Sequence, residues 1–403
     1  MGFGQGLSGL NAASQNLDVI GNNIANSGTV GFKAGSATFA DVYASSRVGL
    51  GVQVASINQR FTTGIVSTTG NQFDMAIDGA KGLFVVQQPN GGATLYTRNG
   101  QFFADKSGNI VNAQGQQLMG YSADVSVTPA KPIMGTLLGL TVPSGNIDPK
   151  ATTTITDKLN LDSGSPILAG PPAPDLTDPT TYSTSFPTTV FDSLGNEHRI
   201  DQVYQKTGVN TWTATYIWNN AGTPTPVGTA TLNFNTAGAL PTPAPTGAIA
   251  FNPPGADPIA TTVRYDGTTQ FAGGFTTDFI QDGYGTGEYA SMSIGTDGSV
   301  VANYTNGAKQ VMGFVAMADF KNLQGLQPVG GNAWAETANS GQPIPGTPGV
   351  NGMATIKGQA VEESNVDMSQ ELVNMIIAQR TYQANAQTIK TQDQILQTLI
   401  TMR

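Results

Sequence analysis

The sequence predicts an α+β protein in which an N-terminal and a C-terminal helix pair as a coiled coil, with nested, mainly antiparallel β domains between them. Three observations lead to this prediction. Apolar residues recur at alternating spacings of three and four near both ends of the chain. Between the ends, short β-branched or aromatic runs alternate with Asn-Gly and related turn pairs. Two Pro-rich stretches then divide this middle region.

The composition limits the classes of protein to consider. The chain has 403 residues, which exceeds one domain at about 150 residues per domain. Charged residues make up 11% of it, against about 25% in typical soluble domains. Such a chain suits turn-rich β-structure, or a surface that copies of the same chain cover; an ordinary secreted β-protein fits the composition equally well. The net charge of −9 and the absence of a Lys/Arg cluster argue against a nucleic-acid partner.

The chain also lacks the signals of several cellular routes. It has no Cys, which excludes disulfides, thiolate catalysis and Cys-bound metals. It has no run of 18 apolar residues, so we expect no membrane insertion. Its first twenty residues lack a basic segment followed by a continuous apolar core, so we expect export, if it occurs, without a Sec signal.

Residues 3–24 predict an amphipathic helix with a 4-3-4-3-4-3 spacing of seam positions. Asp18 is the one charged residue of this segment, so the other faces of the helix are also expected to meet protein. The seam comprises Phe3, Leu7, Leu10, Ser14, Leu17, Gly21 and Ile24. The residues expected to support self-assembly are Leu7, Leu10, Leu17, Ile20 and Ile24.

A second helix is predicted from Met368 to the end of the chain. Asp367 and Gln370 resemble a capping box at its start. Roughly 34 residues at about 1.5 Å each give a rod about 50 Å long. The seam comprises Met368, Leu372, Met375, Gln379, Tyr382, Ala386, Ile389, Asp393, Leu396 and Ile400, with Gln379 and Asp393 as candidate register-setting positions. The residues expected to support self-assembly are Leu372, Met375, Ile376, Gln379, Arg380, Tyr382, Ala386, Ile389, Leu396 and Ile400.

The two helices are predicted to pair with each other. The alternative is that each packs separately on a β core. Pairing is favoured because the seam periods match and neither seam has another helix to meet. The chain between the helices is then one long excursion whose ends lie together.

The middle of the chain predicts hairpins. Residues 83–121 carry turn pairs such as Asn90-Gly91 and Asn99-Gly100 between short strands, and predict a meander. Similar texture recurs at 187–240 and from about 285. Residues 141–186 and 241–258 are Pro-rich and predict extended joints, and a Gly/Pro-rich arm precedes the last helix.

The nested order predicts four parts. They are a helical coiled-coil assembly domain (1–30 plus 366–403), a joint (31–70 plus 353–365), a discontinuous inner β domain (71–144 plus 284–352) and an inserted outer β domain (145–283).

Both ends of the chain resemble one known family. Residues 16–33 read NLDVIGNNIANSGTVGFK, and residues 362–396 read EESNVDMSQELVNMIIAQRTYQANAQTIKTQDQIL. These stretches, with FDMAIDGAKGLFVV from Phe73, resemble the bacterial flagellar rod and hook axial proteins. The N-terminal signature positions are Asn22, Asn23, Ile24, Ala25, Asn26, Thr29, Gly31, Phe32 and Lys33. About a third of the chain carries the resemblance, and the central block matches nothing as sharply.

The length and the single large insertion resemble the hook members of this family. That resemblance implies an extracellular structural subunit that self-assembles into a curved tubular polymer and transmits motor torque as a universal joint. The implied partners are other copies of the chain, the distal rod, hook cap, hook-length control and hook–filament junction proteins, and the flagellar type III export apparatus. The alternatives are a distal rod or other axial subunit, or a glycan-binding or enzymatic β-domain protein.

The amide-rich turn after the first helix has a physical interpretation. Asn and Gly tolerate left-handed backbone and end helices. We therefore expect Asn22, Asn23 and Asn26 to terminate the helix, Gly31 to permit a close turn with Gly28, and Phe32 to anchor the chain. A plain Asn/Gly cap is the alternative; the family resemblance favours a joint between the helical layer and the β domains.

The resemblance also implies an assembly mechanism. The apolar stripes have no partner before assembly, so we expect the termini to be disordered in the monomer and to fold on docking. Stiffening the joints near 145 and 283 should leave assembly intact and change the curvature of the polymer.

No motif predicts catalysis or a cofactor. His198 follows a β-turn and is expected to be a strand residue. Residues 283–288, GYGTGE, lack the strand-loop-helix context of a nucleotide site. Asp105 and Asp297 resemble turn residues rather than calcium ligands, and Glu362 a favourable charge near a helix start. The alternating aromatics of one strand, Trp212, Tyr216 and Trp218, could form a sugar-binding face, but core packing explains them more simply.

Overall fold

The computed structural model describes residues 3–43, 49–127, 129–143, 145–168, 173–220 and 222–401. The chain separates into two compact units. We call Met1–Ser144, Ser291–Asn303 and Lys309–Arg403 the helix-bearing unit, and Gly145–Ala290 with Tyr304–Ala308 the inserted unit. The four-part division drawn from the sequence is finer than this and stays a prediction.

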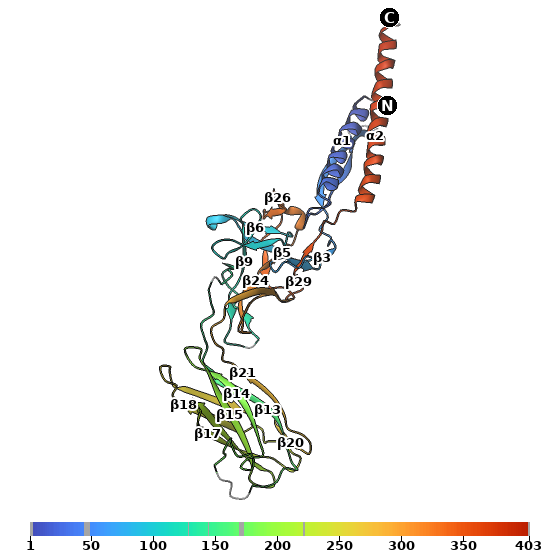
Figure 1. The fold of residues 1–403 in the computed structure, drawn as a ribbon. Helices are drawn as coiled ribbons and strands as arrows, with labels where there is room; N and C mark the ends of the chain where they lie inside the picture. Colours follow the sequence, from blue (N-terminus) through green and yellow to red (C-terminus); the bar gives the residue numbers. More distant parts are fainter. Residues whose placement is uncertain are drawn as a thin grey trace. The chain divides into compact units, whose positions relative to one another are not determined.

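Two long helices occupy the ends of the chain, as predicted (Figure 1). They are α1 (Phe3–Ala25) and α2 (Met368–Thr401). The Asp367 carboxylate caps α2 by accepting hydrogen bonds from the backbone amides of Ser369 and Gln370, at 2.9 and 3.1 Å. The Gln370 side chain donates to Asn374 instead of turning back to Asp367, so half of the predicted capping box forms.

The helices pair antiparallel within the helix-bearing unit, which confirms the predicted pairing. Gly6 lies against Ile389, and Gly9 lies against Asn385. A Cβ at Gly9 would stand 2.9 Å from Asn385 Oδ1, so the close approach depends on the missing side chain. This pairing positions the signature turn beside the start of α2.

A hairpin packs against α1 and continues from its end. It consists of β1 (Gly35–Tyr43) and β2 (Gly49–Gln59), which pair antiparallel. This hairpin lies in the predicted joint (31–70), for which no strands are expected from the sequence. Two short antiparallel pairs then join the two halves of the unit: β3 (Val66–Thr68) with β30 (Ala360–Glu362), and β4 (Met75–Asp78) with β29 (Thr355–Gly358).

The rest of the helix-bearing unit is built around a 13-stranded sheet. Its main path is β22 (Tyr289–Ile294), β23 (Ser299–Tyr304), β24 (Lys309–Val315), β9 (Gln117–Tyr121), β5 (Leu83–Gln87), β6 (Thr94–Thr97), β27 (Ala333–Ala335) and β26 (Gln327–Gly330). Off this path lie β7 (Phe102–Ala104), β8 (Ile110–Asn112), β12 (Leu138–Gly139), β25 (Met317–Asp319) and β28 (Ile344–Gly346). A separate pair is β10 (Ala123–Asp124) with β11 (Lys131–Pro132), and short 3₁₀ turns are η1 (Pro89–Gly91) and η2 (Leu323–Gly325).

The predicted meander over residues 83–121 is wrong in its middle. β6 and β7 do not pair; β5 instead pairs with both β6 and β9. The Asn99-Gly100 pair is therefore no hairpin turn. Gly100 is needed for packing, because a Cβ there would stand 1.6 Å from the Met75 carbonyl oxygen.

Several hairpin turns follow one local rule. In residues 105–109, Asp105 Oδ1 accepts the backbone amides of Ser107 and Asn109, both at 2.8 Å, and Gly108 has φ +80°. Asp192 plays the same part in residues 192–196. Asp105 is thus a turn residue, as predicted, because its carboxylate replaces a backbone turn partner.

The inserted unit consists of two sheets around one core. The five-stranded sheet has β18 (Thr246–Phe251), β19 (Ile259–Arg264), β13 (Thr154–Asp162), β20 (Thr269–Phe271) and β21 (Thr276–Gln281). The four-stranded sheet is antiparallel, with β14 (Thr184–Phe191), β15 (Glu197–Lys206), β16 (Thr211–Asn220) and β17 (Thr223–Asn233) in order. Trp212, Tyr216 and Trp218 face the core between the sheets, so they form no exposed sugar-binding face.

Two expectations about the Pro-rich stretches are wrong. β13 lies inside the stretch 141–186, and β18 lies inside 241–258. Both strands show alternating burial: Ile155, Asp157, Leu159 and Leu161 are buried on β13, and every second residue from Gly247 is buried on β18. Among the described residues, no helix is long and apolar enough to cross a membrane.

Candidate self-assembly site and joint

The face of α1 that packs within the chain differs from the predicted seam. Its buried residues are Gly6, Ala12, Ala13, Ile20 and Asn23. Of the seam, Phe3 and Leu7 are exposed, while Leu10, Leu17 and Ile24 are partly exposed. Gly6 and Gly9, which lie against α2, are not among the predicted seam positions.

On α2 the predicted seam agrees in part with the packed face. Its buried residues are Glu371 and Ala378, and α1 contacts Asn385 and the seam residue Ile389. Met375, Ala386 and Ile389 are partly buried, while Gln379, Arg380 and Asp393 are exposed. The exposed apolar residues of α2 are Met368, Leu372, Val373, Ile376, Ile377, Tyr382, Ile395, Leu396 and Ile400.

We call these exposed residues of both helices the apolar stripes. Leu396 is 50% exposed and Ile400 is 76% exposed. A helix that keeps large apolar side chains in water is costly, at about 25 cal/mol per Å² of apolar surface. Faces of this kind mark interaction surfaces.

A groove of about 640 Å³ lies among α1, the β1–β2 hairpin and the first half of α2. Ala13, Ile20, Val52 and Ala378 contribute apolar walls. Its polar edge includes Glu371, which forms an ion pair with Arg60 at 3.3 Å. All three elements of this groove belong to the helix-bearing unit.

The signature turn begins with amide bonds at the end of α1. The Asn26 side chain donates to the carbonyl and side-chain oxygens of Asn22, at 2.9 and 3.0 Å. Thr29 Oγ1 donates to Asn26 Oδ1 at 3.2 Å. These bonds satisfy groups that a helix end leaves unpaired, as expected for Asn22 and Asn26. Ala25, the last residue of α1, is exposed.

Asn23 has a different role from its neighbours. It is buried, and its amide accepts from the Gly35 backbone N–H and donates to the Gly35 carbonyl, both at 2.8 Å. Asn23 therefore fixes the first residue of β1 against α1 instead of terminating the helix.

Gly31 is the tightest point of the turn. Its φ is +72°, and a Cβ there would stand 2.5 Å from the Asn99 backbone nitrogen. Its own N–H donates to the Glu362 carbonyl at 2.7 Å. A Cβ at Gly28 would meet nothing within 4 Å, so the packing there does not require glycine, contrary to the prediction. Phe32 is half-buried, and the chain is anchored by the next residue.

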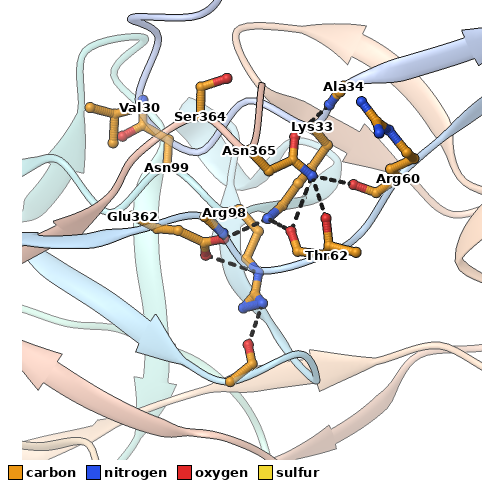
Figure 2. A network of polar contacts seen from close by, with 12 residues as sticks. Val30, Lys33, Ala34, Arg60, Thr62, Arg98, Asn99, Glu362, Ser364 and Asn365 are labelled. Carbon is orange, nitrogen blue, oxygen red and sulfur yellow. Dashed lines mark hydrogen bonds and ion pairs between the residues drawn. The ribbon is translucent and has the colours of Figure 1, made fainter. Parts of the chain in front are cut away.

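Lys33 enters a buried ion cluster with Glu362 and Arg98 (Figure 2). The Lys33 ammonium lies 2.5 Å from Glu362 Oε1 and donates to the Thr62 carbonyl at 2.7 Å. Arg98 Nε lies 3.5 Å from Glu362 Oε2. We call Lys33, Arg98 and Glu362 the joint cluster. It connects the signature turn, the β region and the segment that leads into α2.

Electrostatics in the joint cluster is dominated by burial. Removal from water lowers the pKa of Lys33, and the Glu362 carboxylate opposes that shift. Burial also lowers the pKa of Arg98, again opposed first by Glu362. Glu362 thus compensates two cations from strand β30, so the expectation of a favourable charge near a helix start is wrong.

Asn365 completes the joint from the other half of the chain. Its side-chain oxygen accepts from the Ala34 N–H at 2.8 Å, and its Nδ2 donates to the Arg60 carbonyl at 2.6 Å (Figure 2). The same Nδ2 donates to Thr62 Oγ1 at 2.9 Å. Asn365 therefore ties the residues just before β1 and just after β2 to the segment before α2.

The arrangement offers structural contacts and no evident catalytic chemistry. His198 pairs with Asp192 at 3.0 Å beside Trp218, in the inserted unit. Among the described residues, no group of three His, Cys, Asp or Glu could hold a metal ion.

Four family models match the chain. They are "Flagella basal body rod protein" over residues 5–33, "Flagellar hook protein FlgE/F/G D1 domain" over 76–157, "Flagellar basal body protein FlaE D2 domain" over 160–284 and "Flagellar basal body rod FlgEFG protein C-terminal" over 357–402. The terminal matches coincide with α1 plus the signature turn and with α2. The FlaE D2 match covers most of the inserted unit.

Full-length relatives are also similar. The flagellar hook protein FlgE of Salmonella typhimurium is 42% identical over 408 residues, and that of Escherichia coli K12 is 43% identical over 407, with 100% of each chain covered. The FlgE of Rhizobium meliloti is 34% identical over 99% of this chain and 98% of its own. The fold resembles the solved Helicobacter pylori flagellar hook protein FlgE2, at 14% identity and a TM-score of 0.52, over 73% of this chain and 100% of that one. Since relatives well above 30% identity align from end to end, the chain belongs to the flagellar hook protein FlgE family.

Proposed function

We propose that this chain is the structural subunit of a bacterial flagellar hook, which self-assembles into a curved tube and transmits torque to the filament. The observation that carries the proposal is the pair of apolar stripes, which find no partner in the single chain although α1 and α2 already pair. A tube of identical subunits needs heterologous contacts of this kind. Membership of the FlgE family supplies the identity of the polymer.

The joint explains how the helices could transmit force to the β region. The joint cluster and Asn365 link the chain after α1 to the segment before α2, and Asn23 fixes α1 to the start of β1. A stiff connection lets the helices and the first β region move together, while the apolar stripes hold neighbouring subunits through contacts without ion pairs. Such contacts can slide at low cost when the tube bends.

The partners follow from the same proposal. Other copies of the chain meet the apolar stripes. The distal rod, the hook cap, the hook-length control protein and the hook–filament junction proteins are the expected neighbours at the ends of the tube. Export through the flagellar type III apparatus, without a Sec signal, fits a chain with no Cys.

The experiment places a charge on each stripe. We expect Leu7→Glu and Ile376→Glu to abolish hooks on basal bodies when each variant replaces the parent gene, as counted by electron microscopy. Both side chains are exposed, so the unfolding free energy of the purified monomer should change by less than about 0.5 kcal/mol.

Gln383→Glu is the matched control, because Gln383 is also exposed on α2 but is polar. It should form normal hooks. Normal hooks with both stripe variants would refute the proposal, and loss of hooks with the control would show that any added charge on α2 is harmful.

A further inference from the structure

Asp157 is a buried carboxylate in the inserted unit, far in sequence from the joint. It lies on β13, and its side chain is completely buried. Neither of its carboxylate oxygens makes a hydrogen bond of good geometry among the described residues. A buried ionised carboxylate without a partner is strongly unfavourable.

The backbone around Asp157 is fixed on both sides. β13 pairs parallel with β19 at Thr154–Thr156 and with β20 at Asn160–Asp162. Between these two ladders, Thr268 Oγ1 donates to the Asp157 carbonyl at 3.0 Å and accepts from the Leu159 N–H at 3.2 Å. A rotation of the β13 backbone that turned the Asp157 side chain toward water would break these bonds.

The groups that surround the carboxylate satisfy one another. Tyr204 on β15 donates its hydroxyl proton to Gln202 Oε1 at 2.9 Å. The hydroxyls of Tyr216 on β16 and Tyr265 after β19 are 2.6 Å apart. These three tyrosines are the titratable groups that act on one another or on Asp157 in this core.

No described cation contributes to the pKa shift of Asp157. Lys158, the next residue, is exposed, as is Asp278 on the neighbouring strand β21. Burial raises the pKa of Asp157 to about 7, and weaker hydrogen-bonding interactions with Gln202 and Tyr204 oppose that shift.

We propose that Asp157 is a proton switch for the inserted unit, in which the neutral acid is compatible with the packed core and the carboxylate weakens it. The switch needs no ligand, because the core itself distinguishes the two protonation states. It acts on the inserted unit and leaves the helix-bearing unit unchanged.

The direction of the pH dependence follows from proton linkage. Between the unfolded pKa of 3.8 and the folded pKa of about 7, the folded unit binds a proton that the unfolded chain has lost. The inserted unit therefore loses stability as pH rises through this window. The unfolding equilibrium constant increases by at most about a thousandfold, the ratio set by these two pKa values.

Trp fluorescence of the full-length monomer can report on this unit. The chain has three Trp, of which Trp212 and Trp218 lie in the inserted unit, so Trp334→Phe removes the signal of the other unit. In that background, we expect the urea concentration at the midpoint of unfolding to decrease as the pH is raised from 5 to 8. Asp157→Asn should remove most of this fall and give a higher midpoint than the parent at pH 8.

Asp278→Asn is the control for removing an exposed carboxylate from the same sheet, and it should retain the parent's pH dependence. An unchanged fall in the Asp157→Asn variant would overturn the proposal. If that variant does not fold, carboxyl ¹³C NMR of the parent decides: titration of Asp157 near pH 7 supports the switch, and titration below pH 5 overturns it.

Discussion

Gly28 and Gly31 stand three residues apart in the signature turn, and they differ in what a side chain would meet. Gly31→Ala would place a methyl group 2.5 Å from the Asn99 nitrogen at a φ of +72°. Left-handed backbone alone costs an alanine about 1–2 kcal/mol, so with the clash we expect a loss of more than about 2 kcal/mol in the unfolding free energy. Urea denaturation of the monomer measures it.

Gly28→Ala is the matched control, since its Cβ would meet nothing within 4 Å. It should change the stability by less than about 0.5 kcal/mol. Equal effects of the two substitutions would show that the turn does not hold Gly31 as the structure describes.

The joint cluster predicts an order of effects on stability. Lys33→Met leaves Glu362 paired with Arg98, whereas Glu362→Gln leaves two buried cations without their counterion. Breaking a buried ion pair costs about 3–5 kcal/mol, so we expect Lys33→Met near the lower end of this range and Glu362→Gln above it. The reverse order, measured by urea denaturation, would contradict this description of the cluster.

Arg60→Met serves as the comparison at the edge of the same region. Its ion pair with Glu371 is 3.3 Å long, and the Arg60 side chain is 49% exposed. Solvent screens such a pair, so its loss should cost at most about 1 kcal/mol.

The sequence indicated which residues would be structurally important better than it indicated which residues they would contact. Asn22 and Asn26 end α1 by local bonds over four residues, which a sequence pattern can express. Lys33 and Glu362 are 329 residues apart, and nothing in a single sequence pairs them. Glu362 was expected only as a favourable charge near a helix start, because its burial depends on the strand pair β3–β30.

The cap of α2 allows a prediction at the scale of one element. Asp367 accepts the amides of Ser369 and Gln370, so Asp367→Ala should cost about 1 kcal/mol. The loss should appear as faster amide hydrogen exchange in the first turn of α2. Asp393→Ala, which removes a carboxylate that bonds Gln397 within the exposed part of the helix, should leave that exchange unchanged. Equal exchange in both variants would argue against the cap.

Helices were more predictable than strands for a physical reason. Both helices have a period that continues over many residues, and their first residues agree with the expected Phe3 and Met368. β13 and β18 have nine and six residues, and both lie within stretches whose Pro content favours extended joints over strands. The β1–β2 hairpin has exposed Phe39, Leu50 and Ile57, so it lacks the clear one-sided alternation that marks a strand.

At the scale of the whole molecule, the interior contacts and the assembly contacts use different surfaces. Small residues such as Gly6 and Gly9 form the contact between the two helices within one chain. The apolar stripes therefore stay available after the chain has folded. This separation explains why Phe3, Leu7 and Leu372 of the predicted seam stay exposed although the two helices pair.

The end of α2 tests this separation directly. α1 begins beside Ile389, so the last residues of α2 extend past it without a helix partner (Figure 1). Replacing Ile395, Leu396 and Ile400 together by Gln keeps good helix formers but removes the apolar surface. We expect a monomer of unchanged urea midpoint that forms no hooks.

The control is a second triple variant of α2, in which the exposed polar residues Gln383, Gln387 and Gln394 are replaced by Glu. This control should assemble into hooks. If the Ile395, Leu396 and Ile400 variant assembles as well as the parent, subunits must meet through surfaces other than the end of α2. A lowered monomer midpoint would instead mean that this end already packs within its own chain.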